Sequence, residues 1–94
     1  MWMLIATPPF TAVEQFDAVT AAAGEPEGLR ARYCGAAEGT LRVVTVWESR
    51  EHAERFVTQQ LGPAMATVLG PEPAGRPEFL GLELVRAWEA APVA

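Results

Sequence analysis

The chain has 94 residues and a formal net charge of -5, and half of its residues are hydrophobic. All 7 basic residues are arginines and they form no cluster, which argues against a nucleic-acid partner, because phosphate backbones need concentrated positive charge. We expect a single domain over residues 1–94, and a domain this small buries only about 60–65% of its unfolded surface. The high apolar content therefore predicts a homodimer or an apolar ligand site.

The inventory of reactive side chains is short. Cys34 is the only cysteine, so no intrachain disulfide can form, and one cysteine, one histidine and one aspartate do not supply an ordinary metal site. No glycine-rich phosphate loop is present, and we expect no metal and no other cofactor. The apolar residues 1–6 are too few to cross a bilayer and follow no basic residue, which predicts a cytoplasmic protein without a membrane segment.

The first quarter of the chain predicts one strand and one helix. Residues 1–7 read as a strand that ends before Pro8, since proline cannot donate to a strand ladder. Residues 12–23 repeat apolar side chains every three or four positions, as one face of a helix does, and Gly24 is a typical stop. Thr11 is the predicted N-cap of this helix.

A hairpin is predicted next. One strand begins at Leu29 and reaches a turn at Glu38-Gly39, and a second strand returns over residues 40–48. The preferred register gathers one apolar face and leaves the arginines on the other, whereas a slip of one residue would mix them. In that register the facing pairs are Leu29 with Trp47, Ala31 with Thr45 and Tyr33 with Val43, and the opposite face holds Arg30, Arg32, Cys34, Arg42, Val44 and Val46.

The remaining chain predicts a helix and a strand. Ser49 is a good N-cap, and the helix after it is expected to break at Gly62-Pro63 and then resume as far as Gly70. An extended loop over 71–77 leads to a last strand from Phe79 to Trp88, with Leu80, Leu82, Leu84, Arg86 and Trp88 on one face. The order βαββαβ predicts an α+β, ferredoxin-like fold with a four-stranded antiparallel sheet.

The segment Trp47-Glu48-Ser49, followed by Phe56 and Leu61-Gly62-Pro63, resembles the strand-to-helix junction of antibiotic biosynthesis monooxygenase-type proteins. The resemblance implies a dimeric α+β barrel, in which two sheets pair face to face across a homodimer. It also implies an apolar pocket for a small aromatic or polyketide-like molecule, and oxygenation without a cofactor. Such chemistry needs a dry pocket, a proton acceptor and an oxyanion donor.

The sequence departs from this pattern at several places. It keeps Trp47, which the resemblance places in the substrate cavity, but Val43 stands where an asparagine is expected and Ala53 where a tyrosine is expected. The haem-degrading members of the superfamily use an asparagine, a tryptophan and a histidine, and we do not expect that activity here. The residues at those three places are Ala6 or Thr7, Phe56, and a residue near Ala66.

Two groups of candidate site residues follow. The candidate catalytic residues are Trp47, Tyr33, His52 and Arg86, and the candidate substrate-binding residues are Thr45, Phe56, Met65 and Arg32. Each has a structural alternative. Trp47 could serve only to pack the core, Tyr33 could be a core tyrosine whose hydroxyl reaches solvent, and His52 could be a solvated residue of a first helical turn.

Two interpretations are also open for the two arginines on strands. Arg32 and Arg86 could bind a phenolate or carboxylate, or could pair with the partner's Glu83 or the partner's Glu48 across a dimer interface. Cys34 is expected to be a small buried hydrophobe. The leading function is an antibiotic biosynthesis monooxygenase-like enzyme. The alternatives are a cyclase or isomerase of natural-product biosynthesis on the same fold, and a non-catalytic ligand-binding dimer.

Overall fold

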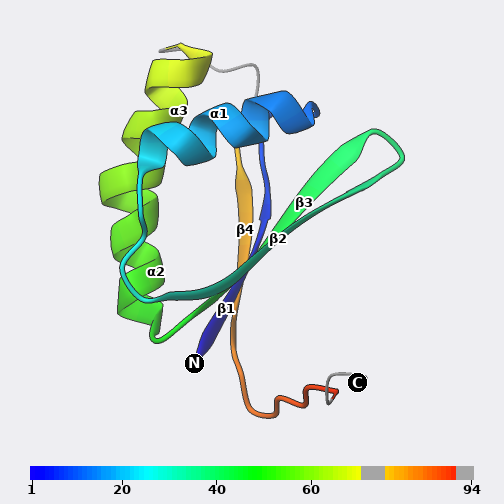
Figure 1. Cartoon of the computed structure of the whole chain (residues 1–94), viewed down its shortest axis with the longest axis vertical. Coiled ribbons are helices and arrows are strands. Elements are labelled where there is room, and N and C mark those ends of the chain that lie inside the picture. The colour runs from blue at the N-terminus through cyan, green and yellow to red at the C-terminus, as the bar shows by residue number, and fades with distance from the viewer. Residues whose placement is uncertain (71–75, 91–94) are drawn as a thin grey trace.

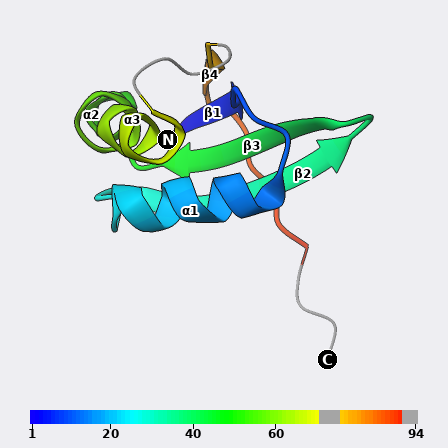
Figure 2. The same cartoon turned by 90° about the horizontal axis from the view of Figure 1, so that it is seen from above.

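Four antiparallel strands form one sheet, and the helices lie on one side of it (Figures 1 and 2). The computed structural model describes residues 1–70 and 76–90. The strand order is β2-β3-β1-β4, so the predicted βαββαβ order and ferredoxin-like architecture are confirmed. The elements are β1 (Trp2–Thr7), α1 (Val13–Ala23), β2 (Leu29–Ala37), β3 (Thr40–Trp47), α2 (Arg50–Phe56), the π-helical turn η1 (Val57–Leu61), α3 (Gly62–Leu69) and β4 (Glu78–Glu83).

The register between β2 and β3 differs from the predicted one. Leu29 does face Trp47, but a β-bulge follows, and Arg32 rather than Ala31 faces Thr45. Tyr33 consequently faces Val44 instead of Val43. A bulge sets two residues of one strand against one of the other, so every side chain beyond it changes face.

The bulge redistributes charge between the two faces of the sheet. Arg32 and Cys34 share the face of the buried Thr45 and therefore point toward the helices, whereas the register predicted from the sequence puts them on the open face. Ala31 and Tyr33 move to the open face, where the Tyr33 side chain is 65% exposed. The open face is thus more apolar, and the helix-covered face more polar, than the sequence predicted.

The second helical region does not break at Gly62-Pro63. Instead, α2, η1 and α3 follow one another without a gap, and the Gly62 N–H donates to the carbonyl of Val57, five residues back. Pro63 cannot donate a helical hydrogen bond, and in a regular helix its ring would crowd the carbonyl four residues earlier. The wider π turn just before Pro63 relieves that conflict while the chain stays helical.

The last strand is shorter than predicted. It ends at Glu83, and the Leu84 N–H still donates to the Met1 carbonyl over 2.9 Å. Arg86 and Trp88 therefore lie outside the strand, and Trp88 is exposed.

Two other expectations concern the element ends. The helix α1 has Ala12 as its N-cap and no side-chain cap, so Thr11 does not cap it. Ser49 does cap α2, because its side chain accepts a hydrogen bond from the His52 N–H over 3.2 Å.

The predicted loop over 71–77 falls largely on residues 71–75, which lie outside the described part of the chain. Among the described residues, no helix is long and apolar enough to cross a membrane.

The core lies between the sheet and the helices. Gln60 of η1 links the second helical region to the first, since its side-chain amide donates to the Ala23 carbonyl at the end of α1 over 2.8 Å. Trp47 and Leu41 of β3 are the largest fully buried side chains. The buried apolar residues are Phe10, Val19, Leu41, Trp47, Ala53 and Ala64.

No described element covers the other face of the sheet. Its side chains alternate with the buried ones along each strand, and they are mostly large and apolar. Leu80 of β4 is 56% exposed there. The apolar members of this open face are Met3, Ile5, Ala31, Tyr33, Val44, Val46, Leu80 and Leu82.

Candidate functional site

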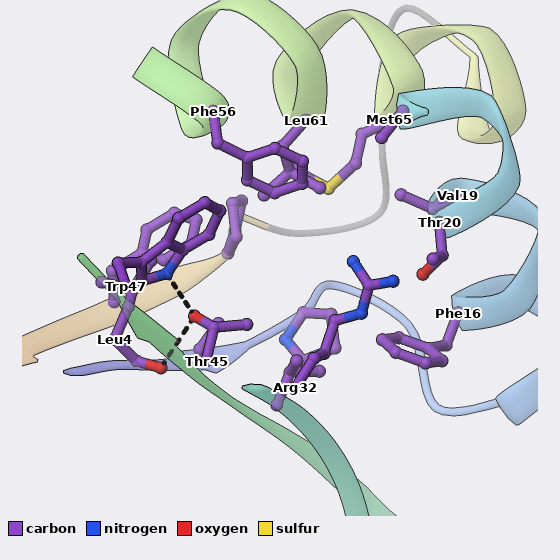
Figure 3. Close-up of a pocket in the computed structure, with 16 residues that line it drawn as sticks. Leu4, Phe16, Val19, Thr20, Arg32, Thr45, Trp47, Phe56, Leu61 and Met65 are labelled. Carbon is purple, nitrogen blue, oxygen red and sulfur yellow. Dashed lines mark hydrogen bonds between the residues drawn. The ribbon is translucent and has the colours of Figure 1, made fainter. Parts of the chain in front are cut away.

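A pocket of about 70 Å³ lies between the helix-covered face of the sheet and the helices (Figure 3). Its floor comes from the four strands, and its walls come from α1, α2, η1 and α3. Five of the predicted site residues line it, namely Trp47, Thr45, Phe56, Met65 and Arg32. Apart from Arg32, the lining side chains within residues 1–70 and 76–90 are uncharged, and most are apolar.

A short hydrogen-bond chain fixes one end of this pocket. The Trp47 indole Nε1–H donates to Thr45 Oγ1 over 2.8 Å, and Thr45 Oγ1 donates to the Leu4 carbonyl over 3.3 Å (Figure 3). Both Trp47 and Thr45 are buried, so these bonds satisfy polar groups that water cannot reach. The hydroxyl hydrogen of Thr45 is committed to Leu4, and a ligand could use only a remaining lone pair.

Trp47 and Phe56 form the aromatic wall of the pocket. Their ring centroids are 5.2 Å apart and the planes are tilted by 40°, within the range of favourable aromatic pairs. Trp47 is only 1% exposed, so it serves as a core anchor and as pocket wall at once. A role in core packing and a role in contacting a ligand are therefore compatible for Trp47.

Arg32 brings a positive charge into these apolar surroundings. Its guanidinium extends from β2 toward Phe16 and Thr20 of α1 (Figure 3). Within residues 1–70 and 76–90, the ion pairs are Met1–Glu83, Arg30–Glu48 and Arg50–Glu54, and none includes Arg32. A partly buried arginine without a carboxylate partner among the described residues favours the approach of an anion.

The π turn sets the opposite wall. Leu61 ends η1 and Met65 lies one turn later in α3, and both side chains reach over the pocket toward the sheet (Figure 3). A π turn adds one residue to the helix, so it sets the angle at which all later side chains emerge. Met65 is unbranched and flexible, which allows this wall to adjust to a ligand.

The other three predicted site residues lie elsewhere. Tyr33 is on the open face of the sheet, and Arg86 follows β4, where its Nη1 donates to the neighbouring Val85 carbonyl. The His52 ring contacts Ser49 through Nδ1 over 2.7 Å and lies directly against Gly28, whose positive φ and lack of a Cβ make room for it. These residues could reach the pocket of this protomer only if the chain rearranged.

Sequence reasoning missed the contribution of the first helix. Phe16, Val19 and Thr20 of α1 line the pocket together with Leu4 of β1. Phe16 and Val19 belong to the apolar repeat of residues 12–23, and Thr20 lies four residues after Phe16 on the same helix face. The helical spacing therefore predicts that Thr20 faces inward. It does not indicate which part of the core contains a pocket.

Cys34 is exposed rather than buried, because β2 is an edge strand of the sheet. Partial desolvation raises the pKa of its thiol, and the negative charge of Asp17 on α1 raises that pKa further. A raised pKa lowers the thiolate fraction at neutral pH, so Cys34 is a poor nucleophile. It does not line the pocket.

The composition of the pocket limits its chemistry. Its described lining contains no carboxylate, histidine, cysteine or tyrosine, so no side chain there is an evident proton acceptor. Arg32 can hold a negative charge, and the aromatic wall can hold a ring by stacking. The arrangement is suited to binding an aromatic ligand and to stabilising an oxyanion on it.

A second hollow lies beyond Leu4 and Phe79, which border both spaces. Its volume is about 240 Å³, but it is wide open to solvent. Arg50 lies 5.1 Å above the ring centroid of Trp2, and Gly81 leaves the space that this ring occupies. We take the smaller pocket as the candidate site because it is more enclosed and can exclude water.

Comparisons with solved structures support the fold. The chain is similar to an arginine-to-serine mutant of MhuD with two manganese protoporphyrin IX molecules bound per active site, with a TM-score of 0.70 and 19% identity over 96% of this chain and 100% of that chain. It is similar to SnoaB, a cofactor-independent oxygenase from Streptomyces nogalater, studied as an asparagine-to-alanine mutant (TM-score 0.63, 12% identity, 92% of this chain and 93% of that one). A protein described as an antibiotic biosynthesis monooxygenase gives a TM-score of 0.60 at 13% identity, over 92% of this chain and 100% of that chain.

These similarities show that the chain has the fold of antibiotic biosynthesis monooxygenase proteins. No protein-family profile and no curated protein matches its sequence. The pocket as described is far too small for a porphyrin, and its lining has no histidine, cysteine or tyrosine to ligate a haem metal. The residues present therefore do not fit the group bound by MhuD, and we derive no step through it.

Proposed function

We propose that the enclosed pocket binds a small aromatic or polyketide-like molecule and that the protein is a cofactor-independent monooxygenase of natural-product metabolism. The observation that carries this proposal is the meeting of the Trp47–Phe56 aromatic wall with the unpaired guanidinium of Arg32 in one apolar pocket. The fold shared with SnoaB supports it. The wall would position a ring, and the guanidinium would stabilise negative charge that develops on it.

The chemistry would depend largely on the substrate. A methylene carbon next to an ionised phenol or enol can pass electrons directly to dioxygen, gain one oxygen atom as a carbonyl, and release the other oxygen with both methylene hydrogens as water. No external reductant is required. Because the described lining offers no evident base, the substrate must be acidic enough to lose its proton to water before it enters the pocket. Arg32 would favour that ionisation.

Two alternatives use the same pocket. A cyclase or isomerase would hold a folded poly-β-ketone there and stabilise its enolate through Arg32, without dioxygen. A non-catalytic binding protein would need only the apolar walls. The described lining has no histidine, tyrosine or carboxylate to act as acid or base in a cyclase or isomerase, so the binding protein is the stronger of these two alternatives.

We also propose that the protein acts as a homodimer, closed into an α+β barrel by its open sheet face. Met3, Ile5, Tyr33, Leu80 and their neighbours form an apolar surface that no described element covers. Contiguous apolar patches on soluble proteins typically mark interaction sites. A second copy would bring an identical surface, as a two-fold symmetric interface requires.

Two measurements test the catalytic proposal. Native mass spectrometry of the purified protein would detect a retained small molecule, and oxygen uptake with a panel of anthrones and related phenols would detect turnover. We expect a bound aromatic compound and oxygen consumption with the acidic members of the panel. Binding without oxygen uptake would favour the cyclase or the non-catalytic protein, and the absence of any binding would refute a ligand function for the pocket.

A further inference from the structure

We propose that the ligand of this pocket is an aromatic monoanion, whose single negative charge pairs with Arg32 while its ring packs against the apolar walls. This inference rests on the proposed ligand-binding function and adds the charge of the ligand. It depends on how Arg32 is placed, on which polar atoms remain unused in the pocket, and on the size of the space.

The placement of Arg32 follows from a specific feature of the hairpin. Without the bulge between Leu29 and Ala31, alternation along β2 would put Arg30 and Arg32 on the same face of the sheet. With the bulge, Arg30 stays exposed and lies 3.8 Å from Glu48, while Arg32 faces Thr45 inside. Bulges commonly re-aim side chains near functional sites. Here the bulge directs Arg32 into the pocket and leaves Arg30 at the surface.

The charge of Arg32 is uncompensated within the described residues. Asp17 of α1 affects Cys34, two residues further along the same face of β2, but is not within ion-pair distance of Arg32. Placing a cation in an apolar pocket costs free energy unless it is paired. A ligand anion would supply the missing partner, which gives the pocket a preference for negative charge.

The other polar groups agree with this preference. Thr45 Oγ1 already accepts from Trp47 and donates to Leu4, so it offers a ligand no donor. Thr20 lies beside the Arg32 guanidinium, and its hydroxyl can donate to the same anion (Figure 3). Five guanidinium hydrogens and one hydroxyl make a donor-rich end, which a carboxylate or phenolate oxygen complements.

The space limits the size of the ligand. The 70 Å³ pocket is about half of a cavity of roughly 150 Å³ that holds benzene in another protein. A single ring therefore requires small movements, which the flexible side chains of Arg32 and Met65 can supply. Fused rings would also require the helices to shift. We accordingly test the inference with single-ring compounds.

The first experiment compares benzoate with benzamide, which share shape but differ in charge. Isothermal titration calorimetry should show benzoate binding roughly tenfold more tightly or better, as expected for one charge-assisted hydrogen-bonded pair. Arg32→Gln should abolish this preference and leave benzamide binding unchanged, whereas Arg32→Lys should keep part of it. Arg55→Gln makes the same change of charge on an exposed helical residue outside the pocket and should leave the preference intact.

The second experiment needs no variant for its main result. Para-nitrophenol is colourless as the phenol and yellow as the phenolate, so its absorbance reports its ionisation when bound. Near neutral pH, the wild-type protein should increase the yellow fraction, because Arg32 stabilises the phenolate. In Arg32→Gln the apolar pocket should instead decrease it. A purely structural role of Arg32 would not reverse the sign of this change.

The outcomes separate this inference from the proposed function. Equal binding of benzoate and benzamide, or a shift of para-nitrophenol toward the phenol in the wild type, would overturn the monoanion while leaving a ligand pocket in place. Failure of benzoate, benzamide and para-nitrophenol all to bind would refute both. If Arg32→Gln does not fold, the Arg32→Lys variant and the wild-type colour change still decide the question.

Discussion

Trp47 connects the stability of the core with the shape of the pocket. Its indole is 1% exposed, packs 5.2 Å from the Phe56 ring and donates to Thr45. A residue with these contacts contributes mainly to stability, and its effect on ligands comes from the ring edge that remains toward the pocket. The two contributions can be separated by substitutions of different size.

We expect Trp47→Ala to lower the free energy of unfolding by about 3–5 kcal/mol through the cavity that it leaves, and Trp47→Phe to lower it by about 1–2 kcal/mol. Thr45→Val, which keeps the shape but removes the acceptor of the indole N–H, should cost about 1–3 kcal/mol. Chemical denaturation measures all three. If Trp47→Phe is as stable as the wild type but loses ligand affinity, Trp47 is a ligand contact rather than a core anchor.

The environment of Cys34 gives a second prediction at this scale. Desolvation and the charge of Asp17 both raise the pKa of the thiol, so alkylation by iodoacetamide near neutral pH should be slower than that of a free cysteine. Asp17→Asn removes the second contribution and should lower the pKa and speed the reaction. The rates are followed by mass spectrometry. An unchanged rate in Asp17→Asn would mean that Asp17 does not act on the thiol.

At the scale of elements, the order and approximate ends of most strands and helices were predictable, because periodicity, Ser49 and the glycine stops act locally. The bulge between Leu29 and Ala31 was not. An alternating sequence is compatible with two strand registers. The choice between them depends on packing against α1, and the local sequence does not reveal that packing. Because of the bulge, Arg32 lies on the helix-covered face and lines the pocket, whereas Tyr33 lies on the open face and does not.

The π turn shows the same limit in a helix. Gly62-Pro63 correctly marked an irregularity, but a proline after glycine more often ends a helix than widens it. Continuation is favoured because Ala64 is buried and Leu61 and Met65 pack against the core, so a break would expose them. The tertiary contacts of α3 therefore decide between a break and a π turn.

The first turn of α2 predicts a dependence of stability on pH. Hydrogen bonds from its own backbone N–H and from Ser49 hold the pKa of Glu51 below its ordinary value of 4.5, with the Arg50 charge contributing less. A lowered folded-state pKa stabilises the fold above pH 4.5, and this contribution is lost as the pH falls through the lowered value.

Glu51→Gln should consequently lower the melting temperature at neutral pH, and the difference from the wild type should vanish in acid once the wild-type carboxyl is protonated. Thermal unfolding followed by circular dichroism across this range provides the measurement. A difference that stays constant at all pH values would show that the charge of Glu51 does not interact with the helix start.

At the scale of the whole molecule, the sequence predicted that one sheet face is left without helices but not how apolar that face is. Moving Arg32 and Cys34 inside and Tyr33 outside leaves Arg42 as the charged residue among the outward positions of β2 and β3 beyond the bulge. A monomer with this surface would be prone to aggregate, since the sheet also has two edge strands, β2 and β4. Pairing of two copies accounts for the surface most simply.

We therefore expect a homodimer at micromolar concentration, which Leu80→Glu should dissociate. Leu80 is 56% exposed in one chain, so a glutamate there should cost the isolated subunit little, but across a closed interface it would bury an unpaired charge at a cost of about 3–5 kcal/mol. That cost raises the dimer dissociation constant by roughly two to four orders of magnitude. Val13→Glu, on α1 and 50% exposed, makes the same kind of change away from the sheet and should leave the dimer intact.

Light scattering should give twice the 10.1 kDa chain mass for the wild type and the control, and a mass near 10.1 kDa for Leu80→Glu. A wild-type mass of one chain, or a Leu80→Glu variant that remains dimeric, would show that the open face is not the interface.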